Sequence, residues 1–391
     1  MDWPGTAVEK ISPQRFKPPF CPNPDCLTNK PDGHAFRWNC IGYYTRKCDR
    51  RFIPRYDCRA CPRTFSQQTF ATTYYLKRPK LLPIIAAGLL SCSAARQIAR
   101  AIGCSHSTVN LQGNRLGRHA LLLQSLALQN IVTVNEAIVY DHFETFAACQ
   151  EMQLGVGTPV GANSWFVFGM DPVPHKLGNK MTETRKKRLE KLEKRWGGIP
   201  QGSYVESTRN ALDLILPKVP EGETLRWISD GHTSYPRAIE NHPERQRITH
   251  QVHVVPERGP KGSERSDQAA ARDRAMFPAD LLHKLMRHSG ANHKRETIAF
   301  GRRSNMIVLR GFLLGIWRNF VKNRSERRPT GRGPAVELGL ADRLWSWERV
   351  LAKRLFPFQE TVPSGWMKLY RQEMETPGVG RNIRHELLYA F

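Results

Sequence analysis

Residues 81 to 125 carry apolar positions at helical spacing. The run LLPIIAAGLL (81–90) predicts a first helix, and the apolar side chains of 95–102 fall on one face of a second. Gly103 then breaks the chain, and Ser105 is suited to cap a third helix that starts at His106. Helices joined by such a tight turn are typical of a helix-turn-helix motif, which places its last helix in the major groove of DNA.

The N-terminal end of that last helix faces the edges of the bases. We therefore expect base contacts from its first residues and phosphate contacts from two arginines further along it. The residues concerned are His106, Ser107, Thr108 and Asn110 for the bases, and Arg115 and Arg118 for the phosphates.

From about residue 130 the pattern changes to the two-residue alternation of β-strands. In NEAIVYDHFETFA, Val139, Asp141 and Phe143 share one face, and LRWISDG is a short apolar strand that ends at Asp230. Further strands are predicted at 163–171 (NSWFVFGMD), with QLGVGTPVG before it as a hairpin partner, and at 248–255 (ITHQVHVV). This pattern predicts an α/β domain.

Helical periodicity returns in three later segments. ANHKRETIAFGRRSNMIVLRGFLLGIWRNFVK predicts a long helix with Glu296 near its start and Arg303 seven residues later on the same side. TRKKRLEKLEKRWGG (184–198) predicts a basic amphipathic helix, whose charges either follow phosphates or simply face solvent. KNRSERRPTGRGP (322–334) is typical of a flexible basic linker, and the aromatic-rich remainder predicts a helical C-terminal segment.

The charge of the chain indicates its class of partner. Its 391 residues include 60 Lys and Arg against 35 Asp and Glu, a formal net charge of +25. Such an excess indicates a polyanion, and nucleic acid is favoured over a membrane because the longest apolar run is too short to span a bilayer. The N-terminus also lacks the pattern of a signal peptide, so we expect a cytoplasmic, nucleoid-associated protein with reduced thiols.

Two closely spaced cysteine pairs stand near the N-terminus. They are Cys21 and Cys26 in CPNPDC, and Cys58 and Cys61 in YDCRAC. Four thiolates suit tetrahedral Zn²⁺, and a small polar module needs a metal because it cannot bury much apolar surface. His34, Cys40 and Cys48 lie between the pairs, but neither cysteine has a close partner and the segment resembles a β-hairpin. A zinc ribbon is therefore expected.

Two predicted strands carry a carboxylate where apolar side chains are expected. A buried carboxylate such as Asp141 or Asp230 is costly unless it is paired or binds a cation. Three carboxylates in a basic groove could hold two Mg²⁺ or Mn²⁺ ions for phosphodiester displacement. Glu296 is the favoured third acid, and the rivals before it are Glu264, Asp267, Asp273 and Asp280.

The order of these features resembles bacterial insertion-sequence transposases with an RNase H-like (DDE) catalytic domain. YDHFETF and SDGHTSYPRAI resemble the first and second acid motifs of such families, and NHKRETIAFGRRSN with WRNFVKNRSERR resembles the third-acid helix. The resemblance covers roughly residues 18–325. It implies that Asp141, Asp230 and Glu296 bind magnesium and that Arg303 contacts DNA.

The expected organisation has four parts. They are a zinc ribbon (1–75), a helix-turn-helix domain (76–125), an RNase H-like mixed-sheet α/β domain (130–325) with a basic insertion near 184–198, and a basic linker with a helical segment (326–391). The expected activity is strand cleavage and 3′-hydroxyl strand transfer at element ends, by a homo-oligomer on double-stranded DNA. Two alternatives stay open: a DNA-binding regulator with a decayed catalytic domain, and a nuclease that does not join ends.

Overall fold

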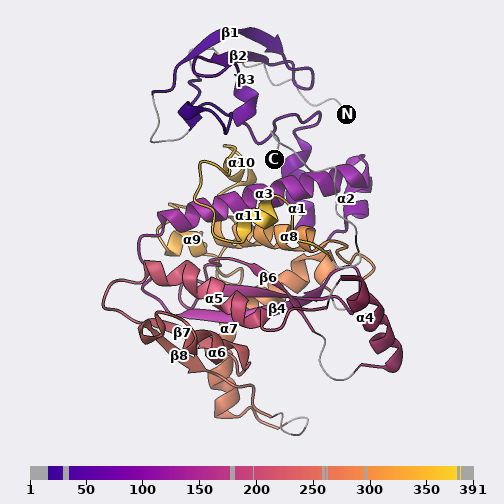
Figure 1. The fold of residues 1–391 in the computed structure, drawn as a ribbon, viewed down its shortest axis with the longest axis vertical. Helices are drawn as coiled ribbons and strands as arrows, with labels where there is room; N and C mark the ends of the chain where they lie inside the picture. The colour runs from indigo at the N-terminus through magenta and orange to yellow at the C-terminus, as the bar shows by residue number, and fades with distance from the viewer. Residues whose placement is uncertain are drawn as a thin grey trace.

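The N-terminal residues form a small antiparallel sheet, at the top of Figure 1. The computed structural model describes residues 16–29, 35–176, 181–196, 198–257, 260, 263–294, 297–376 and 379. The strands of this sheet are β1 (Trp38–Thr45), β2 (Phe52–Cys58) and β3 (Thr64–Ser66). Aromatic side chains, including Tyr56 and Phe65, fill this part of the chain together with cysteines. We call residues 16–70 the cysteine module.

Three helices follow the cysteine module. They are α1 (Leu81–Leu89), α2 (Ala95–Ile102) and α3 (His106–Asn130). α2 ends at Gly103, whose φ is 61°, and the Ser105 side chain caps α3 by accepting the N–H of Thr108. Val109 is fully buried. The helices, the glycine turn and the cap that the sequence predicted are confirmed.

A five-stranded mixed sheet forms the centre of the larger body. Its strands are β4 (Ile138–Phe146), β5 (Gln153–Gly161), β6 (Asp171–His175), β7 (Leu225–Ser229) and β8 (Ile248–Val252), in the order β6-β5-β4-β7-β8. β4, β5 and β6 pair antiparallel, whereas β7 runs parallel to β4 and β8 parallel to β7. The predicted α/β class with a mixed sheet is confirmed.

Helices cover both faces of this sheet. α5 (Ser203–Ile215) and α6 (Ser234–Glu240) pack on the face that carries Tyr140 and His142. α7 (Asp267–Ser289) packs on the face that carries Val139 and Asp141. This division follows from the strand geometry, because consecutive side chains point to opposite faces. α4 (Glu183–Trp196) projects from the body at the right of Figure 1.

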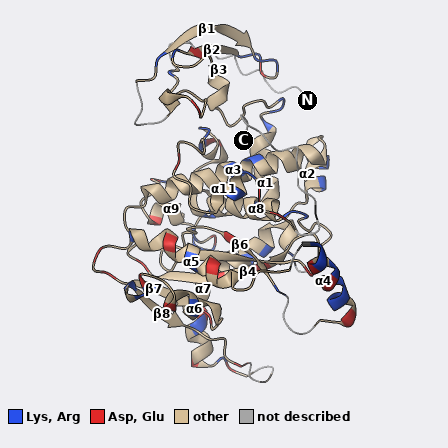
Figure 2. Ribbon diagram, in the orientation of Figure 1, with Lys and Arg blue, Asp and Glu red and all other residues tan. Residues whose placement is uncertain are grey.

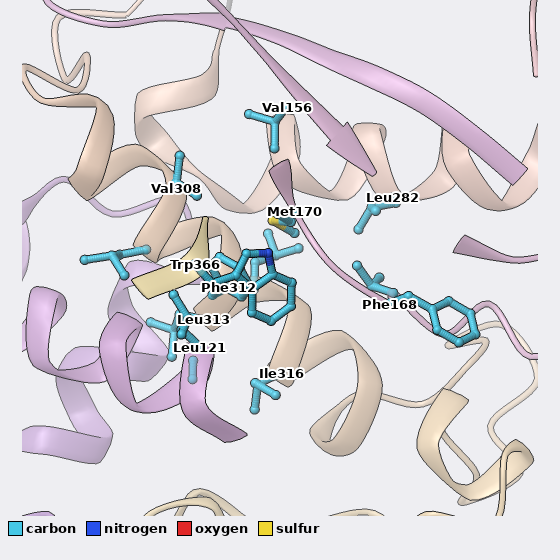
Figure 3. Packing of buried hydrophobic residues seen from close by; sticks show 14 of the residues in the cluster. Leu121, Val156, Phe168, Met170, Leu282, Val308, Phe312, Leu313, Ile316 and Trp366 are labelled. Carbon is cyan, nitrogen blue, oxygen red and sulfur yellow. The ribbon is translucent and has the colours of Figure 1, made fainter. Parts of the chain in front are cut away.

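The long helix α3 lies beside α8 (Ser304–Ile316) above the sheet (Figure 1). The core at this contact is filled by large apolar side chains, among them Leu121 of α3, Phe312 of α8 and Trp366 of α11 (Trp366–Tyr370) (Figure 3). Gly117 lets the two helices approach closely, because a Cβ there would lie 2.6 Å from the Cβ of Leu309. No helix of the described chain is long and apolar enough to cross a membrane.

The C-terminal segment returns to the cysteine module after two short helices, α9 (Pro334–Glu337) and α10 (Trp347–Val350). Arg354 is 6% exposed and donates to the backbone carbonyl of Thr69 at 2.8 Å. The ring of Phe356 packs edge-on against Phe20, with centroids 5.2 Å apart. Residues 350–359 therefore connect the cysteine module to the larger body.

The strand predicted at 163–171 is shifted. Its first part makes an isolated bridge between Val160 and Val167, and the regular strand β6 begins only at Asp171. At this bridge, the side-chain amides of Gln124 and Asn319 donate to the carbonyl of Val167. These buried amides come from α3 and from the π-helix Trp317–Val321 that follows α8, and they take over part of the backbone pairing that a strand would supply.

The long helix predicted from about residue 296 is shorter than expected. α8 begins at Ser304, so Arg303 stands just before the helix and its predicted helical relation to Glu296 is wrong. In the preceding segment, Thr297 bonds the carbonyl of Ala291 and the N–H of Ala299, which holds the backbone in a non-helical form. Glu296 itself lies outside the described residues.

The basic stretch 322–334 was predicted to be a flexible linker, and it folds into a closed loop instead. The N–H of Arg324 donates to the carbonyl of Arg332 at 2.9 Å. Arg318, which is 2% exposed, donates to the carbonyls of Asn323 and Arg324. The loop is therefore attached to the core through a buried arginine.

Candidate functional site

The four predicted zinc ligands come together at one end of the N-terminal sheet. All four sulfur atoms lie within 4.8 Å of one another. The Sγ atoms of Cys21 and Cys61 are 3.6 Å apart, and those of Cys26 and Cys58 are 3.8 Å apart. A tetrahedral zinc with bonds of about 2.3 Å would separate its sulfurs by about 3.8 Å. The cluster could therefore hold Zn²⁺.

Polar groups around the cluster suit thiolate sulfur. The hydroxyl of Thr28 lies 3.2 Å from Cys26 Sγ, and the N–H of Ala60 donates to Cys58 Sγ at 3.3 Å. Such donors orient and stabilise metal-bound thiolates. Cys40 and Cys48 are exposed and lie outside the cluster, as predicted, whereas His34 is not among the described residues.

Asp141 lies on β4, and Asp230 directly follows the neighbouring strand β7. β4 and β7 run parallel with Tyr140 opposite Ser229, so the residue after each member of this pair is one of the two aspartates. Burial, followed by the charge of Asp230, raises the pKa of Asp141 to about 7. The two carboxylates predicted from separate motifs are thus brought close enough to repel each other.

Asp141 is held by three groups. Its Oδ1 accepts the N–H of His142 at 2.8 Å and the hydroxyl of Tyr235 at 3.3 Å. Its Oδ2 lies 3.5 Å from Nδ1 of His283, whose other ring nitrogen is 2.8 Å from the hydroxyl of Thr158. Burial lowers the pKa of His283 to about 3, so this imidazole is neutral at pH 7 and does not balance the charge of Asp141.

The side chain of His142 points to the opposite face of β4. It stacks on the ring of Tyr204 with centroids 3.8 Å apart and is 6% exposed. Burial lowers its pKa well below the ordinary value. His142 therefore packs between β4 and α5.

A third acid, Asp280, reaches the same region from α7. It lies three residues before His283, and its charge contributes to the raised pKa of Asp141. Arg272 forms an ion pair with Asp280. Although burial alone would lower the pKa of Arg272, the hydrogen bond to Asp280 raises it. Asp280 was only one of several rivals in the sequence.

The other acids have different surroundings. Asp273 pairs with Arg265, and Glu264 and Asp267 are exposed. Across the described part of the chain, the four cysteines are the only group of three or more possible ligands whose atoms lie within 4.8 Å of one another. Asp141, Asp230 and Asp280 therefore do not form a cluster of that tightness.

The predicted DNA-reading residues at the start of α3 differ in exposure. His106 and Ser107 are exposed, whereas Thr108 and Asn110 are half-buried. Asn110 accepts a hydrogen bond from Arg310 of α8 at 3.2 Å. The first turn of α3 thus presents His106 and Ser107 to solvent.

Arg115 and Arg118 do not fit the predicted phosphate contacts. Arg115 donates to the carbonyls of Thr72 and Tyr74, and Arg118 is 5% exposed with its guanidinium over the ring of Tyr370. The reason is the length of α3, which continues for 25 residues and is covered by the C-terminal segment. Both arginines connect parts of the protein in this structure.

Lysine and arginine positions are frequent along the ribbon of α4 (Figure 2). Leu189 is 4% exposed, which anchors the helix to the body as its periodicity predicted. Arg185 lies 3.3 Å from the carboxylate of Glu151, and Lys187 and Lys191 are exposed. The outer face of α4 is therefore positively charged.

His283 was missed by the sequence reasoning. The pattern that could have found it is the spacing of Asp280 and His283, because residues three apart share one face of a helix.

No protein-family model matches this chain, and no curated protein matches it either.

Proposed function

We propose that this protein is a transposase with an RNase H-like catalytic domain, which cleaves DNA strands and joins them to a target. The observation that carries the proposal is the pair formed by Asp141 on β4 and Asp230 at the end of the parallel strand β7, in a chain of net charge +25. Asp280 is the third carboxylate that we assign to this site. Glu296, outside the described residues, is the alternative.

The donor set of this site suits Mg²⁺ or Mn²⁺, which prefer carboxylate oxygens. When bound, such ions would activate the attacking oxygen and stabilise the leaving one. Among the described residues, the basic side chain within ion-pair distance of Asp141 is His283, which is neutral, and this favours a metal ligand. Asp280 is paired with Arg272, so that pair has to open for Asp280 to join the site.

The protein's own groups would position the acids. Tyr235 and the N–H of His142 fix one oxygen of Asp141, and the N–H of His232 fixes Oδ1 of Asp230 at 2.9 Å. Rigid strands then keep the two carboxylates at a constant separation. DNA would be held by the start of α3 and by the basic face of α4, the latter through sequence-independent phosphate contacts.

The proposal is tested with supercoiled plasmid and a labelled oligonucleotide that ends in a 3′-hydroxyl, in Mg²⁺ or Mn²⁺. We expect the protein to nick the plasmid and to join the oligonucleotide to it. Asp141→Asn and Asp230→Asn should reduce nicking by about 100-fold or more, because each removes a metal ligand, and should leave duplex binding unchanged. Asp267→Asn is the matched control on α7, because Asp267 is an exposed acid, and should keep activity.

Each other outcome identifies a different role. Nicking without joining would indicate the nuclease, and duplex binding without nicking would indicate the regulator. Loss of duplex binding in Asp141→Asn would mean that this carboxylate is structural. Asp280→Asn and Glu296→Gln decide the third acid, since only the true ligand should abolish nicking.

A further inference from the structure

A pocket of about 400 Å³ opens on the α7 side of the sheet. Residues after β5 and residues of α7 line it: Ala162, Trp165, Asp273, Arg274, Phe277 and Pro278. Its volume is within the range of ligand sites, and its lining combines two aromatic rings with charged side chains.

Trp165 has an unusual backbone in this pocket. Its φ is 60°, a conformation that is costly for a bulky side chain and that recurs at functional sites. The neighbouring Phe166 is fully buried, whereas Trp165 is half-buried and lines the pocket. The strained backbone therefore accompanies a large aromatic ring that is kept out of the core.

Cations and a second ring surround Trp165. The guanidinium of Arg324 lies 4.2 Å from the centre of its ring, and that of Arg318 lies 5.6 Å away. The ring of Phe277, which is 42% exposed, is 5.2 Å from that of Trp165. Aromatic rings combined with arginines are the groups on which proteins stack the unpaired bases of single strands.

Helix α7 carries residues of both the pocket and the carboxylate site. Phe277 and Asp280 are three residues apart on α7, about 5 Å along the helix axis. Arg272 links the two places, because it pairs with Asp280 and lies 3.7 Å from Asp273 in the pocket lining. A strand whose phosphate lies at the carboxylates would have its next nucleotide near the pocket.

We propose that this pocket binds an unpaired nucleobase of the DNA strand that is cut, stacked on Trp165 and Phe277. Arg274 and Arg324 contact the adjoining phosphates. The inference rests on the proposed function, because it places the base beside the catalytic carboxylates. It adds a preference for single-stranded DNA at the cleavage site, which the carboxylates alone do not provide.

The test compares the binding of the full-length protein to fluorescein-labelled oligo(dT) and to an abasic oligomer of equal length. The two probes carry the same phosphates, so only base contacts distinguish them. We expect tighter binding of oligo(dT). Phe277→Ala and Trp165→Ala should weaken oligo(dT) binding roughly five- to hundredfold and leave the abasic oligomer unchanged, whereas Trp165→Phe should retain the preference.

Tyr43→Ala is the matched control, since Tyr43 is 45% exposed and belongs to β1, which lies far from α7 in the fold (Figure 1). Its preference for oligo(dT) should equal that of the unaltered protein. Equal affinity of the unaltered protein for both probes would overturn the inference. The inference would also be overturned if Phe277→Ala lost the same affinity for both probes at an unchanged melting temperature. Phe277 would then affect contacts to the phosphates and not to the bases.

Failure of this inference differs from failure of the proposed function. Plasmid nicking that depends on Asp141, without any preference for oligo(dT), would contradict base binding in the pocket and leave the proposed cleavage activity supported. The opposite result is a protein that prefers oligo(dT) through Trp165 and Phe277 but never nicks DNA in Mg²⁺ or Mn²⁺. That result would contradict the proposed cleavage activity and support base binding in the pocket.

Discussion

Asp141 is the residue whose surroundings are most informative. It is mostly buried, it lies beside a second carboxylate, and the imidazole nearest to it is neutral. Proteins rarely keep such a group without a cation, because the repulsion and the lost hydration lower the stability of the fold. The cost is measurable as a dependence of stability on pH.

Asp141→Asn should stabilise the protein at pH 8 in buffer without added Mg²⁺ or Mn²⁺. The pKa of Asp141 is raised from 3.8 to about 7 in the folded state. The folded state then holds its proton where the unfolded state has lost it, so the free energy of unfolding falls as pH rises from about 4 to about 7. Each pKa unit corresponds to about 1.4 kcal/mol. Asparagine removes this loss, and thermal unfolding between pH 5 and pH 8 should show a gain that grows with pH.

Asp267→Asn is the control for this measurement, because Asp267 is an exposed acid on α7 and should give no such gain. A lower melting temperature of Asp141→Asn at pH 8 would contradict the prediction. It would mean that the hydrogen bonds from His142 and Tyr235 to the carboxylate outweigh its repulsion from Asp230.

At the scale of elements, local patterns predicted more than distant contacts did. The strand alternation around Asp141 and the cap at Ser105 depend on neighbouring residues, and both are confirmed. The shift of β6 depends on hydrogen bonds between segments far apart in the chain, such as that from Asn319 to Val167. The spacing of apolar residues within a short segment does not reveal contacts with a distant one.

The same distinction applies to the candidate site. Asp141 and Asp230 could be predicted because each stands in its own short motif on a strand. The approach of Asp280 depends on how α7 docks on β4, and the burial of Arg118 depends on Tyr370 at the other end of the chain. Charge and periodicity around Arg118 suggested an exposed cation, and only the packed structure places it inside.

The crossing of α3 and α8 provides a test at this scale. A Cβ at Gly117 would lie 2.6 Å from the Cβ and the backbone oxygen of Leu309, so Gly117→Ala should destabilise the protein by about 1–3 kcal/mol. Gly113→Ala in the same helix is the control, because its Cβ would meet only the end of the Leu89 side chain at 3.2 Å. Alanine favours a helix over glycine, so the control should be neutral or slightly stabilising in denaturant unfolding. Equal stability of the two variants would contradict the close crossing.

At the scale of the whole molecule, the cysteine module and the larger body are joined by residues 350–359. Phe356 belongs to the aromatic cluster of the module, and the backbone N–H of Arg354 donates to the carbonyl of Phe70 at 3.1 Å. The module contains few apolar side chains besides these rings, so we expect its fold and this contact to depend on the metal that the cysteines could hold.

Cys58→Ser should therefore affect a segment about 300 residues away in the sequence. Without its fourth sulfur ligand the module should lose zinc and unfold, and the partners of Arg354 and Phe356 should be lost with it. We expect metal analysis to show zinc near zero, and hydrogen exchange of 350–359 to accelerate while β4 and β7 remain protected.

Cys40→Ser is the control, because Cys40 is exposed and outside the cluster, and it should change neither measurement. Unchanged zinc in Cys58→Ser would refute the ligand assignment. Zinc loss with unchanged exchange at 350–359 would show instead that the C-terminal segment is held by the larger body alone.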